Sequence, residues 1–225
     1  MSAGVNLSNF NNLLQYSYMK KAGIILSLIF GVLIATSVWA YSSNFVSDVL
    51  TLIDTPEKQQ VFFGELSGQE HFFVIDSAED FNLYINILIP DLPGVNKDFS
   101  LTLSKEEELL FLDGKSYTWA PYVDTFSNDH YYQGPSADLN LEAGNYVIEV
   151  FSADNNGKYA LIVGNDNNTN FKEFFKQLWK MPRIKHFFET SPIFAYLNRA
   201  GLFTFSIIIF AIAVISQFTG FKRQK

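Results

Sequence analysis

The sequence contains no cysteine and only three histidines, and these absences remove several kinds of chemistry. Without cysteine there are no disulfides, no thiolate zinc sites and no cysteine nucleophile. The histidines, His71, His130 and His186, are too far apart in sequence to form a zinc-binding pair on one helix. A domain of this composition must therefore be held together by the packing of its core alone.

Basic residues are also scarce. The chain has 16 Lys and Arg against 23 Asp and Glu, which gives a net charge of −7. Nucleic acid is excluded as a partner, because phosphate binding needs a basic surface. The sequence also lacks a Gly-rich phosphate loop and the G-x-S-x-G turn of a serine hydrolase. These absences favour a protein that is not an enzyme. A hydrolase with catalytic residues scattered along the chain stays open as an alternative.

Apolar residues are abundant, at 48% of the chain, and a long apolar run lies near each end. In the first, residues 19–40, Lys20 and Lys21 precede an apolar stretch that ends in Val38-Trp39-Ala40, before a cleavage position at Tyr41. This is the layout of a secretory signal. The run is also about 20 residues long, enough for a retained membrane anchor, and both interpretations stay open. Residues 1–18 are then an upstream extension.

The second run, residues 201–221, carries no charge and is followed by a basic tail at residues 222–225. An uncharged stretch of about 20 residues predicts a transmembrane helix. Because positive charges stay on the cytoplasmic side, the tail is expected in the cytoplasm and the region between the two runs outside it. The sequence therefore predicts a single-pass protein of the cytoplasmic membrane once the signal is cleaved, with membrane lipid among its contacts.

Between the runs, a linker at residues 41–60 is followed by a domain at residues 61–165. The domain has short segments rich in aromatic and β-branched residues, divided by Gly, Pro, Asn and Asp. The expected strands are residues 59–66, 70–75, 81–89, 99–104, 108–113, 116–123, 130–134, 145–151 and 158–164. This spacing predicts an all-β fold, a jelly-roll-like antiparallel β-sandwich.

Residues 141–164, "LEAGNYVIEVFSADNNGKYALIVG", predict a hairpin of two strands around a polar turn. The stretch resembles the closing hairpin of bacterial pre-peptidase C-terminal (PPC) domains, which are β-sandwiches on secreted proteins. The matching positions are Leu141, Ala143, Gly144, Tyr146, Ile148, Val150, Gly157, Tyr159, Leu161 and Val163. All are scaffold positions. The resemblance implies an accessory domain concerned with binding or localisation, here without the peptidase domain that the family accompanies.

Residues 166–200 form a basic, aromatic segment. Phe171, Phe174, Phe175 and Leu178 recur at helical spacing with lysines between them, and Pro182 is expected to end or kink the helix. Such a helix can lie in a lipid interface or can pack its apolar face on the sandwich. A third interpretation, packing against a partner's transmembrane helix, also stays open.

Carboxylates in the predicted loops raise the question of a metal. Hard oxygen ligands suit calcium, and Asp124, Asp129 and Asp154 are the candidates for such a site. The spacing of a calcium-binding loop is missing, however, and Asp and Asn also stabilise turns without any metal. Turn chemistry is therefore the preferred interpretation, and the expected cofactor is none.

Aromatic residues are dense between residues 117 and 132. Rings exposed beside polar groups can stack on sugars or dock peptides, so Trp119, Tyr122, Tyr131 and Tyr132 are candidate ligand-binding residues. The alternative is that some of these rings fill the core while the others cover a loop.

Together these observations predict a non-enzymatic, membrane-anchored, extracytoplasmic β-sandwich with a binding or accessory role at the cell envelope, with a membrane or envelope protein as its partner. Three alternatives stay open: a subunit of a larger membrane complex, a cargo receptor of the eukaryotic secretory pathway, and a hydrolase with an unmarked site.

Overall fold

The structure is a computed structural model that describes residues 25, 41–124, 127–166, 171–191, 201, 205–209 and 211–212. The chain forms two compact units, residues 1–38 with 196–225 and residues 39–195, and only the second is described in detail. The expected extension, the signal or anchor at residues 19–40 apart from residue 25, most of the 201–221 run and the tail lie outside the described residues. Within the part that is described, no helix is long and apolar enough to cross a membrane.

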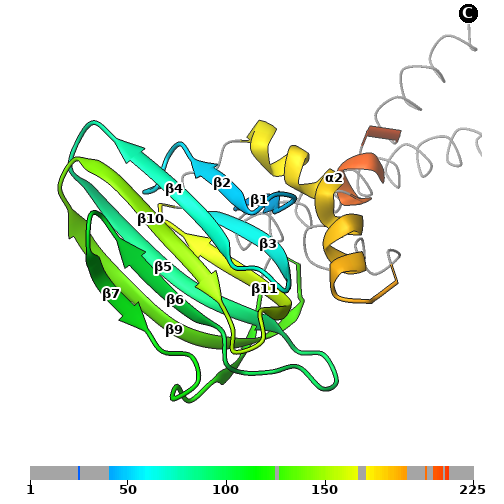
Figure 1. The fold of residues 1–225 in the computed structure, drawn as a ribbon. Coiled ribbons are helices and arrows are strands. Elements are labelled where there is room, and N and C mark those ends of the chain that lie inside the picture. The colour runs from blue at the N-terminus through cyan, green and yellow to red at the C-terminus, as the bar shows by residue number, and fades with distance from the viewer. Residues whose placement is uncertain are drawn as a thin grey trace, which may run out of the picture. The chain divides into compact units, whose positions relative to one another are not determined.

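The second unit is built of strands followed by one helix (Figure 1). The strands are β1 (Ser42–Phe45), β2 (Leu50–Ile53), β3 (Gln60–Ser67), β4 (His71–Ser77), β5 (Phe81–Pro90), β6 (Ser100–Ser104), β7 (Glu108–Leu112), β8 (Ala120–Val123), β9 (His130–Leu141), β10 (Gly144–Phe151) and β11 (Asn156–Val163), and the helix is α2 (Phe171–Phe187).

The strands form two sheets that pack face to face. Sheet A has the order β1-β3-β11-β5-β9-β8, and sheet B has the order β2-β4-β10-β6-β7. The hairpin expected at residues 141–164 therefore does not pair with itself, because β10 lies in sheet B and β11 in sheet A. The chain changes sheet at the Ser152–Asn155 turn, as is common in sandwiches. The predicted β-sandwich is confirmed.

Two details of the prediction are wrong. The segment expected as a linker, residues 41–60, contains β1 and β2, each of which adds an edge strand to one sheet. Both pair in parallel, β1 with β3 and β2 with β4, so the sandwich is antiparallel everywhere except at these two edges. Short edge strands have few apolar residues to mark them, and a parallel partner leaves no hairpin signal in the sequence.

The core between the sheets is filled by the inward positions of both. Tyr146, Ile148 and Val150 from β10 face Tyr159, Leu161 and Val163 from β11, and all are buried. These are the positions on which the resemblance to PPC domains depends, and the structure confirms them as scaffold.

Tyr159 takes its place because of a glycine on the neighbouring strand. A Cβ at Gly64 would lie 2.4 Å from the Tyr159 ring, so only glycine leaves room for it. The Tyr159 hydroxyl lies 2.7 Å from Nδ1 of His71, on a strand of the opposite sheet. This contact joins the two sheets inside the sandwich.

Helix α2 packs on the outer face of sheet A. The Phe187 ring lies 5.3 Å from the Phe63 ring, and the Phe188 ring lies 4.8 Å from the Tyr131 ring, both edge to face. Pro182 lies inside the helix, which continues to Phe187 instead of ending there. Of the interpretations left open for this segment, the structure shows packing on the sandwich.

Candidate functional site

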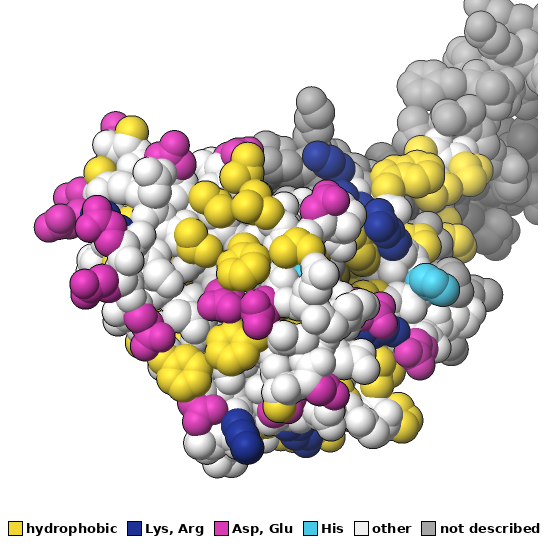
Figure 2. Space-filling view, in the orientation of Figure 1, with side chains coloured by type: hydrophobic (Ala, Val, Ile, Leu, Met, Phe, Trp, Pro, Cys, Tyr) yellow, Lys and Arg dark blue, Asp and Glu magenta, His cyan; other side chains and the backbone are white. Residues whose placement is uncertain are grey.

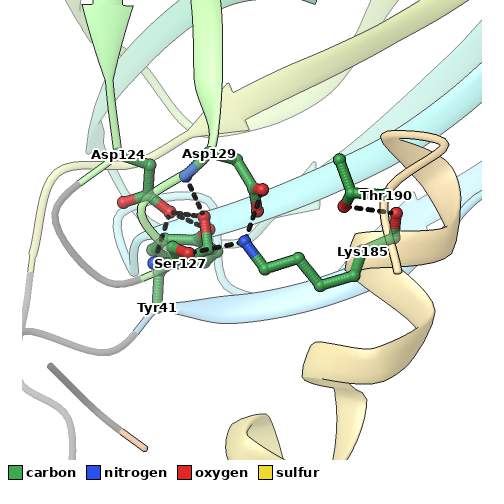
Figure 3. Close-up of polar contacts among 6 residues, drawn as sticks. All are labelled: Tyr41, Asp124, Ser127, Asp129, Lys185 and Thr190. Atoms are coloured by element: carbon green, nitrogen blue, oxygen red, sulfur yellow. Dashed lines mark hydrogen bonds and ion pairs between the residues drawn. The ribbon is translucent and has the colours of Figure 1, made fainter. Parts of the chain in front are cut away.

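A buried polar cluster lies where the β8–β9 loop meets α2 (Figure 3). Asp124 follows β8, and its Oδ2 accepts hydrogen bonds from the Ser127 hydroxyl at 2.7 Å and from the Ser127 backbone N–H at 3.2 Å. Asn128 has a φ of 58°, a conformation that Asn tolerates well. The Tyr41 hydroxyl donates to the same Asp124 oxygen at 2.6 Å. The loop is therefore closed by its own side chains and by the residue that precedes β1.

Lys185 of α2 enters this cluster from the other side. Its Nζ lies 2.6 Å from Oδ1 of Asp129 and donates to the Ser127 carbonyl at 2.8 Å. Both side chains of the ion pair are only 5% exposed. Burial raises the pKa of the Asp129 carboxyl, and the hydrogen bond and charge of Lys185 oppose that rise. The Thr190 hydroxyl donates to the Lys185 carbonyl at 3.0 Å, which helps to fix the end of the helix.

The cluster brings together two of the three carboxylates proposed as calcium ligands, but in a different role. Calcium takes about six to eight oxygen ligands. Here the ammonium group of Lys185 already neutralises Asp129, and Asp124 accepts hydrogen bonds from Ser127 and Tyr41. Across the described part of the chain, no three His or acidic side chains are placed to hold a metal ion. The geometry does not fit calcium and does fit a polar clasp between loop and helix.

The third carboxylate, Asp154, lies in the turn between β10 and β11. Its Oδ1 accepts hydrogen bonds from the Ser152 hydroxyl at 3.3 Å and the Asn156 backbone N–H at 3.2 Å. Asn155 has a φ of 48° there. These are the contacts of an Asp that stabilises its own turn.

The four aromatic candidates serve different purposes. Tyr131 is 2% exposed and lies under Phe188 of the helix region, so it is not available to a ligand. Trp119 packs against the core and donates its indole N–H to the Gly114 carbonyl at 2.8 Å. Both rings therefore belong to the scaffold.

The other two rings are more accessible. Tyr132 packs against the core cluster on one side, and the Lys97 ammonium lies 3.2 Å from its ring centroid. Tyr122 is exposed on β8, at the edge of sheet A. The structure thus does not gather the four rings into one surface.

The outer face of sheet B carries apolar side chains that are exposed to solvent. Figure 2 shows hydrophobic side chains spread across this face, with acidic side chains among them. The exposed members are Val49, Leu50, Leu52, Leu109 and Phe111. Half-buried residues complete the band: Phe72, Val74, Val147 and Phe151. We call these nine residues the sheet B band.

Strand register makes the band continuous. Leu50 pairs with Phe72, and Leu52 pairs with Val74, which in turn pairs with Val147. At the far side, the Phe111 and Phe151 rings are stacked almost parallel, with an interplanar angle of 9° and centroids 6.3 Å apart. The band therefore extends from one edge of sheet B to the other.

Two carboxylates lie within the band. Glu149 on β10 is opposite Phe72, and Glu70 immediately precedes β4. Burial, with the neighbouring charge of Glu70, raises the pKa of Glu149. The band thus combines apolar contact area with a local negative charge.

The sequence contained one signal for this face. In β7, Glu108–Leu112, apolar residues do not alternate with polar ones: Leu110 packs toward the core while Leu109 and Phe111 are exposed. A strand that is apolar on both faces indicates a covered or binding face. Leu50 and Leu52 were missed because they lie in the segment expected as a linker.

Comparisons with protein-family models and with curated proteins gave no match. Among solved structures, the chain is similar to the pre-peptidase C-terminal domain of a collagenase from Bacillus anthracis, with a TM-score of 0.31 and 14% identity over 55% of this chain and 95% of that one. It is also similar to CBM35 from Cellvibrio japonicus Abf62, with a TM-score of 0.27 and 13% identity over 44% and 69%. A β-glucosidase from Paenibacillus barengoltzii gives a TM-score of 0.26 and 9% identity over 56% of this chain and 12% of that one.

Likenesses at these TM-scores carry no argument about family or function. The β-sandwich is established by the two sheets of this structure.

Proposed function

We propose that this protein is a non-enzymatic, membrane-anchored accessory domain that binds a protein of the cell envelope through the outer face of sheet B. The observation that carries the proposal is the sheet B band. Its most exposed member, Leu52, has 67% of its surface open to solvent, and Leu50 and Leu109 have more than half. Large contiguous apolar patches on soluble domains mark interaction sites.

Burial of the sheet B band against a protein partner would be energetically favourable. Fully burying one Leu or Phe side chain contributes about 1.5–3 kcal/mol, so even partial burial of several such side chains is substantial. The stacked rings of Phe111 and Phe151 add apolar area on one side of the band. The exposed band residues carry no side-chain hydrogen-bond donor that would orient a sugar hydroxyl, which favours a protein surface over a polysaccharide.

The carboxylates define the chemistry of that partner. Glu70 and Glu149 sit among apolar side chains, so a complementary surface would be apolar with a lysine or arginine opposite them. The membrane and the extracytoplasmic side are supported by the apolar runs at residues 19–40 and 201–221 and by the lysines that flank them.

Site-specific photo-crosslinking in cells tests the binding face. A photoreactive amino acid at Leu52 or at Phe111 should give the same discrete heavier product, because both side chains belong to one band. The matched control is Asp138, an exposed residue on β9 of sheet A, which should give none. Products from all three positions would indicate crowding rather than a binding face, and no product at Leu52 and Phe111 would overturn the proposal.

The absence of cysteine allows a direct test of sidedness. A single cysteine at Asp138 should react with a membrane-impermeant maleimide in intact cells, whereas one in the 222–225 tail should react only after lysis. The reverse pattern would contradict an extracytoplasmic domain.

A further inference from the structure

Helix α2 presents two different faces. One is buried against the sandwich and consists of Leu178, Met181 and Ile184, extended by Phe188 just beyond the helix. These residues recur every three or four positions, as one face of a helix requires. In the part of α2 whose side chains the structure describes, residues 176–187, this apolar side is thus buried inside the chain and is not available to lipid.

The opposite face is exposed and basic. Lys176, Trp179, Arg183 and His186 are spaced by three, four and three residues, so they also share one side of the helix. Trp179 is at the centre of this face and is 81% exposed, more than any other large hydrophobic side chain in the described part of the chain. We call these four residues the α2 outer stripe.

Attachment of helix α2 to the sandwich does not account for the α2 outer stripe. Most contacts between α2 and the sandwich come from other residues: Gln177 accepts from the Ser43 hydroxyl at 2.6 Å, and Lys185 pairs with Asp129. Arg183 does contribute, since its guanidinium lies 4.1 Å from the Phe45 ring centroid, yet it stays exposed. An exposed Trp between cations has no role in this packing.

The charge of this face also contrasts with the rest of the protein. The whole chain has a net charge of −7, whereas α2 carries Lys172, Lys176, Lys180, Arg183 and Lys185 and a single acidic residue, Glu173. The nearest acidic residue beyond the helix, Glu189, is paired with Lys158 at 2.8 Å. The α2 outer stripe is therefore a cationic surface on an acidic protein.

We propose that the α2 outer stripe lies on the surface of an anionic bilayer, with Trp179 at the headgroup level and Lys176 and Arg183 against lipid phosphates. Tryptophan is enriched at membrane–water interfaces, and lysine and arginine are attracted to anionic headgroups. The proposal rests on membrane anchoring by residues 201–221, which begin so soon after α2 that the connecting chain can span at most about 45 Å. A lipid surface is then within reach of this face.

The proposal implies that α2 is a spacer with two contacts. Its apolar face holds the sandwich, and its basic face meets the lipid, so the helix fixes which side of the sandwich is turned toward the membrane. The outer face of sheet A, under the helix, becomes the membrane side. Sheet B, which forms the opposite layer, stays accessible to a partner.

The test uses the full chain in lipid nanodiscs and exploits the absence of cysteine. A single cysteine replaces His186, carries an environment-sensitive fluorophore, and leaves Trp179 in place. Quenching of the fluorophore by headgroup-level nitroxide lipids is compared between phosphatidylcholine discs and discs that contain phosphatidylglycerol. We expect strong quenching only with phosphatidylglycerol. Each basic residue that is lost should weaken the membrane contact by about fivefold.

The decisive variant is Lys176→Glu with Arg183→Glu, which should reduce quenching in phosphatidylglycerol discs to the phosphatidylcholine level. Its matched control is Lys97→Glu with Lys115→Glu, the same change in net charge at exposed positions of the sandwich, which should leave quenching unchanged. Trp179→Ala should also lower quenching in the phosphatidylglycerol discs. Circular dichroism checks that every variant is folded.

Equal quenching in both lipids, or no quenching in either, would overturn the proposal, and the second result would point to an acidic protein surface as the occupant. Failure of the chain to enter discs would instead count against anchoring by residues 201–221. In that event the labelled chain is mixed with preformed vesicles of the two compositions, where the same contrast is expected. The crosslinking at Leu52 and Phe111 is independent of all these outcomes.

Discussion

The outer faces of the two sheets both carry apolar residues, but those of sheet A are buried and those of sheet B are exposed. On sheet A, five outward apolar residues are buried although they lie outside the core between the sheets: Val61, Phe63, Leu88, Tyr131 and Ala160. On sheet B, the sheet B band remains exposed. The difference is that the end of α2 and Phe188 lie against the first face, on Phe63 and Tyr131, and none of the described elements covers the second. An apolar outward face is therefore completed by the chain itself in one case and, as proposed above, by a partner in the other.

The way in which α2 is held supports this distinction. Ser43 at the start of β1 uses its hydroxyl and backbone N–H as donors to Gln177, and Lys180 donates to the Ser43 carbonyl. Together with the Lys185–Asp129 pair, these contacts fix the helix at both ends of its packed face. A permanently covered face needs such polar specificity, whereas the exposed sheet B band has none.

The largest effect is expected from Lys185→Met. The substitution keeps the length of the side chain but leaves Asp129 as a buried charge without its partner. We expect a loss of about 3–5 kcal/mol in the free energy of unfolding. A urea titration of the detergent-solubilised chain, followed by tryptophan fluorescence, measures it.

A second variant separates the charge from the packing. Lys185→Met combined with Asp129→Asn removes both charges and should recover much of the loss. If the single variant were as stable as the parent protein, Lys185 would not be buried in the clasp and the covered face would be looser than the structure shows.

The next prediction compares the two faces directly. Phe63→Ala, under the helix, should lower the free energy of unfolding by about 3–5 kcal/mol, because it opens a cavity in packed surroundings. Phe111→Ala, in the sheet B band, should cost less than about 1 kcal/mol in the same titration, because its ring is half exposed. Equal losses would mean that the sheet B band is covered in the isolated chain, which would remove the basis of the proposed binding face.

How far the sequence could predict these faces depends on the kind of interaction. The β10 and β11 strands were predictable because Tyr146, Ile148, Tyr159 and Leu161 alternate with outward residues, and alternation is a local signal. The amphipathic helix was predictable for the same reason, although Pro182 did not end it.

Packing of the helix on the sandwich was one of the interpretations left open, but the sequence could not show which sheet the helix would cover. Which sheet is covered depends on contacts between residues far apart in the chain, such as Asp129 with Lys185 and Tyr41 with Asp124. A carboxylate that serves an ion pair has the same sequence signature as one that serves a metal, so the sequence could name Asp124 and Asp129 as candidate ligands but could not show that Asp129 pairs with Lys185. The edge strand β2 was missed because its parallel partner leaves no local signal.

A third prediction concerns the tie between the two sheets. Burial lowers the pKa of His71. In the folded protein the His71 side chain therefore stays neutral at a pH at which the same side chain in the unfolded chain takes up a proton. Stability is then lost as the pH falls through about 6.5, the unfolded value, toward the lowered pKa. His71→Gln should flatten this dependence and change the free energy of unfolding at pH 7 by about 1 kcal/mol.

Urea titrations between pH 7.5 and pH 5.5, a range chosen to span about the ordinary histidine pKa, measure the effect. His130→Gln, at an exposed histidine, is the control and should keep the pH dependence of the parent. An unchanged profile in His71→Gln would show that burial of His71 does not exclude the proton.

The smallest effect is expected within the sheet B band itself. Because the pKa of Glu149 is raised, the folded protein disfavours its ionised form, so this carboxylate contributes most to stability at low pH and least above its folded pKa. Glu149→Gln should therefore raise the free energy of unfolding at pH 7 by about 0.5 kcal/mol or less, and the gain should vanish below about pH 4. Glu108→Gln, at an exposed position on β7, should change little at either pH.

If removing the charge of Glu149 makes the isolated domain more stable, this carboxylate does not serve the stability of the isolated domain. A gain in stability together with a loss of the Leu52 crosslink would therefore show that Glu149 serves the partner. A loss of stability at pH 7 would instead make Glu149 part of the scaffold.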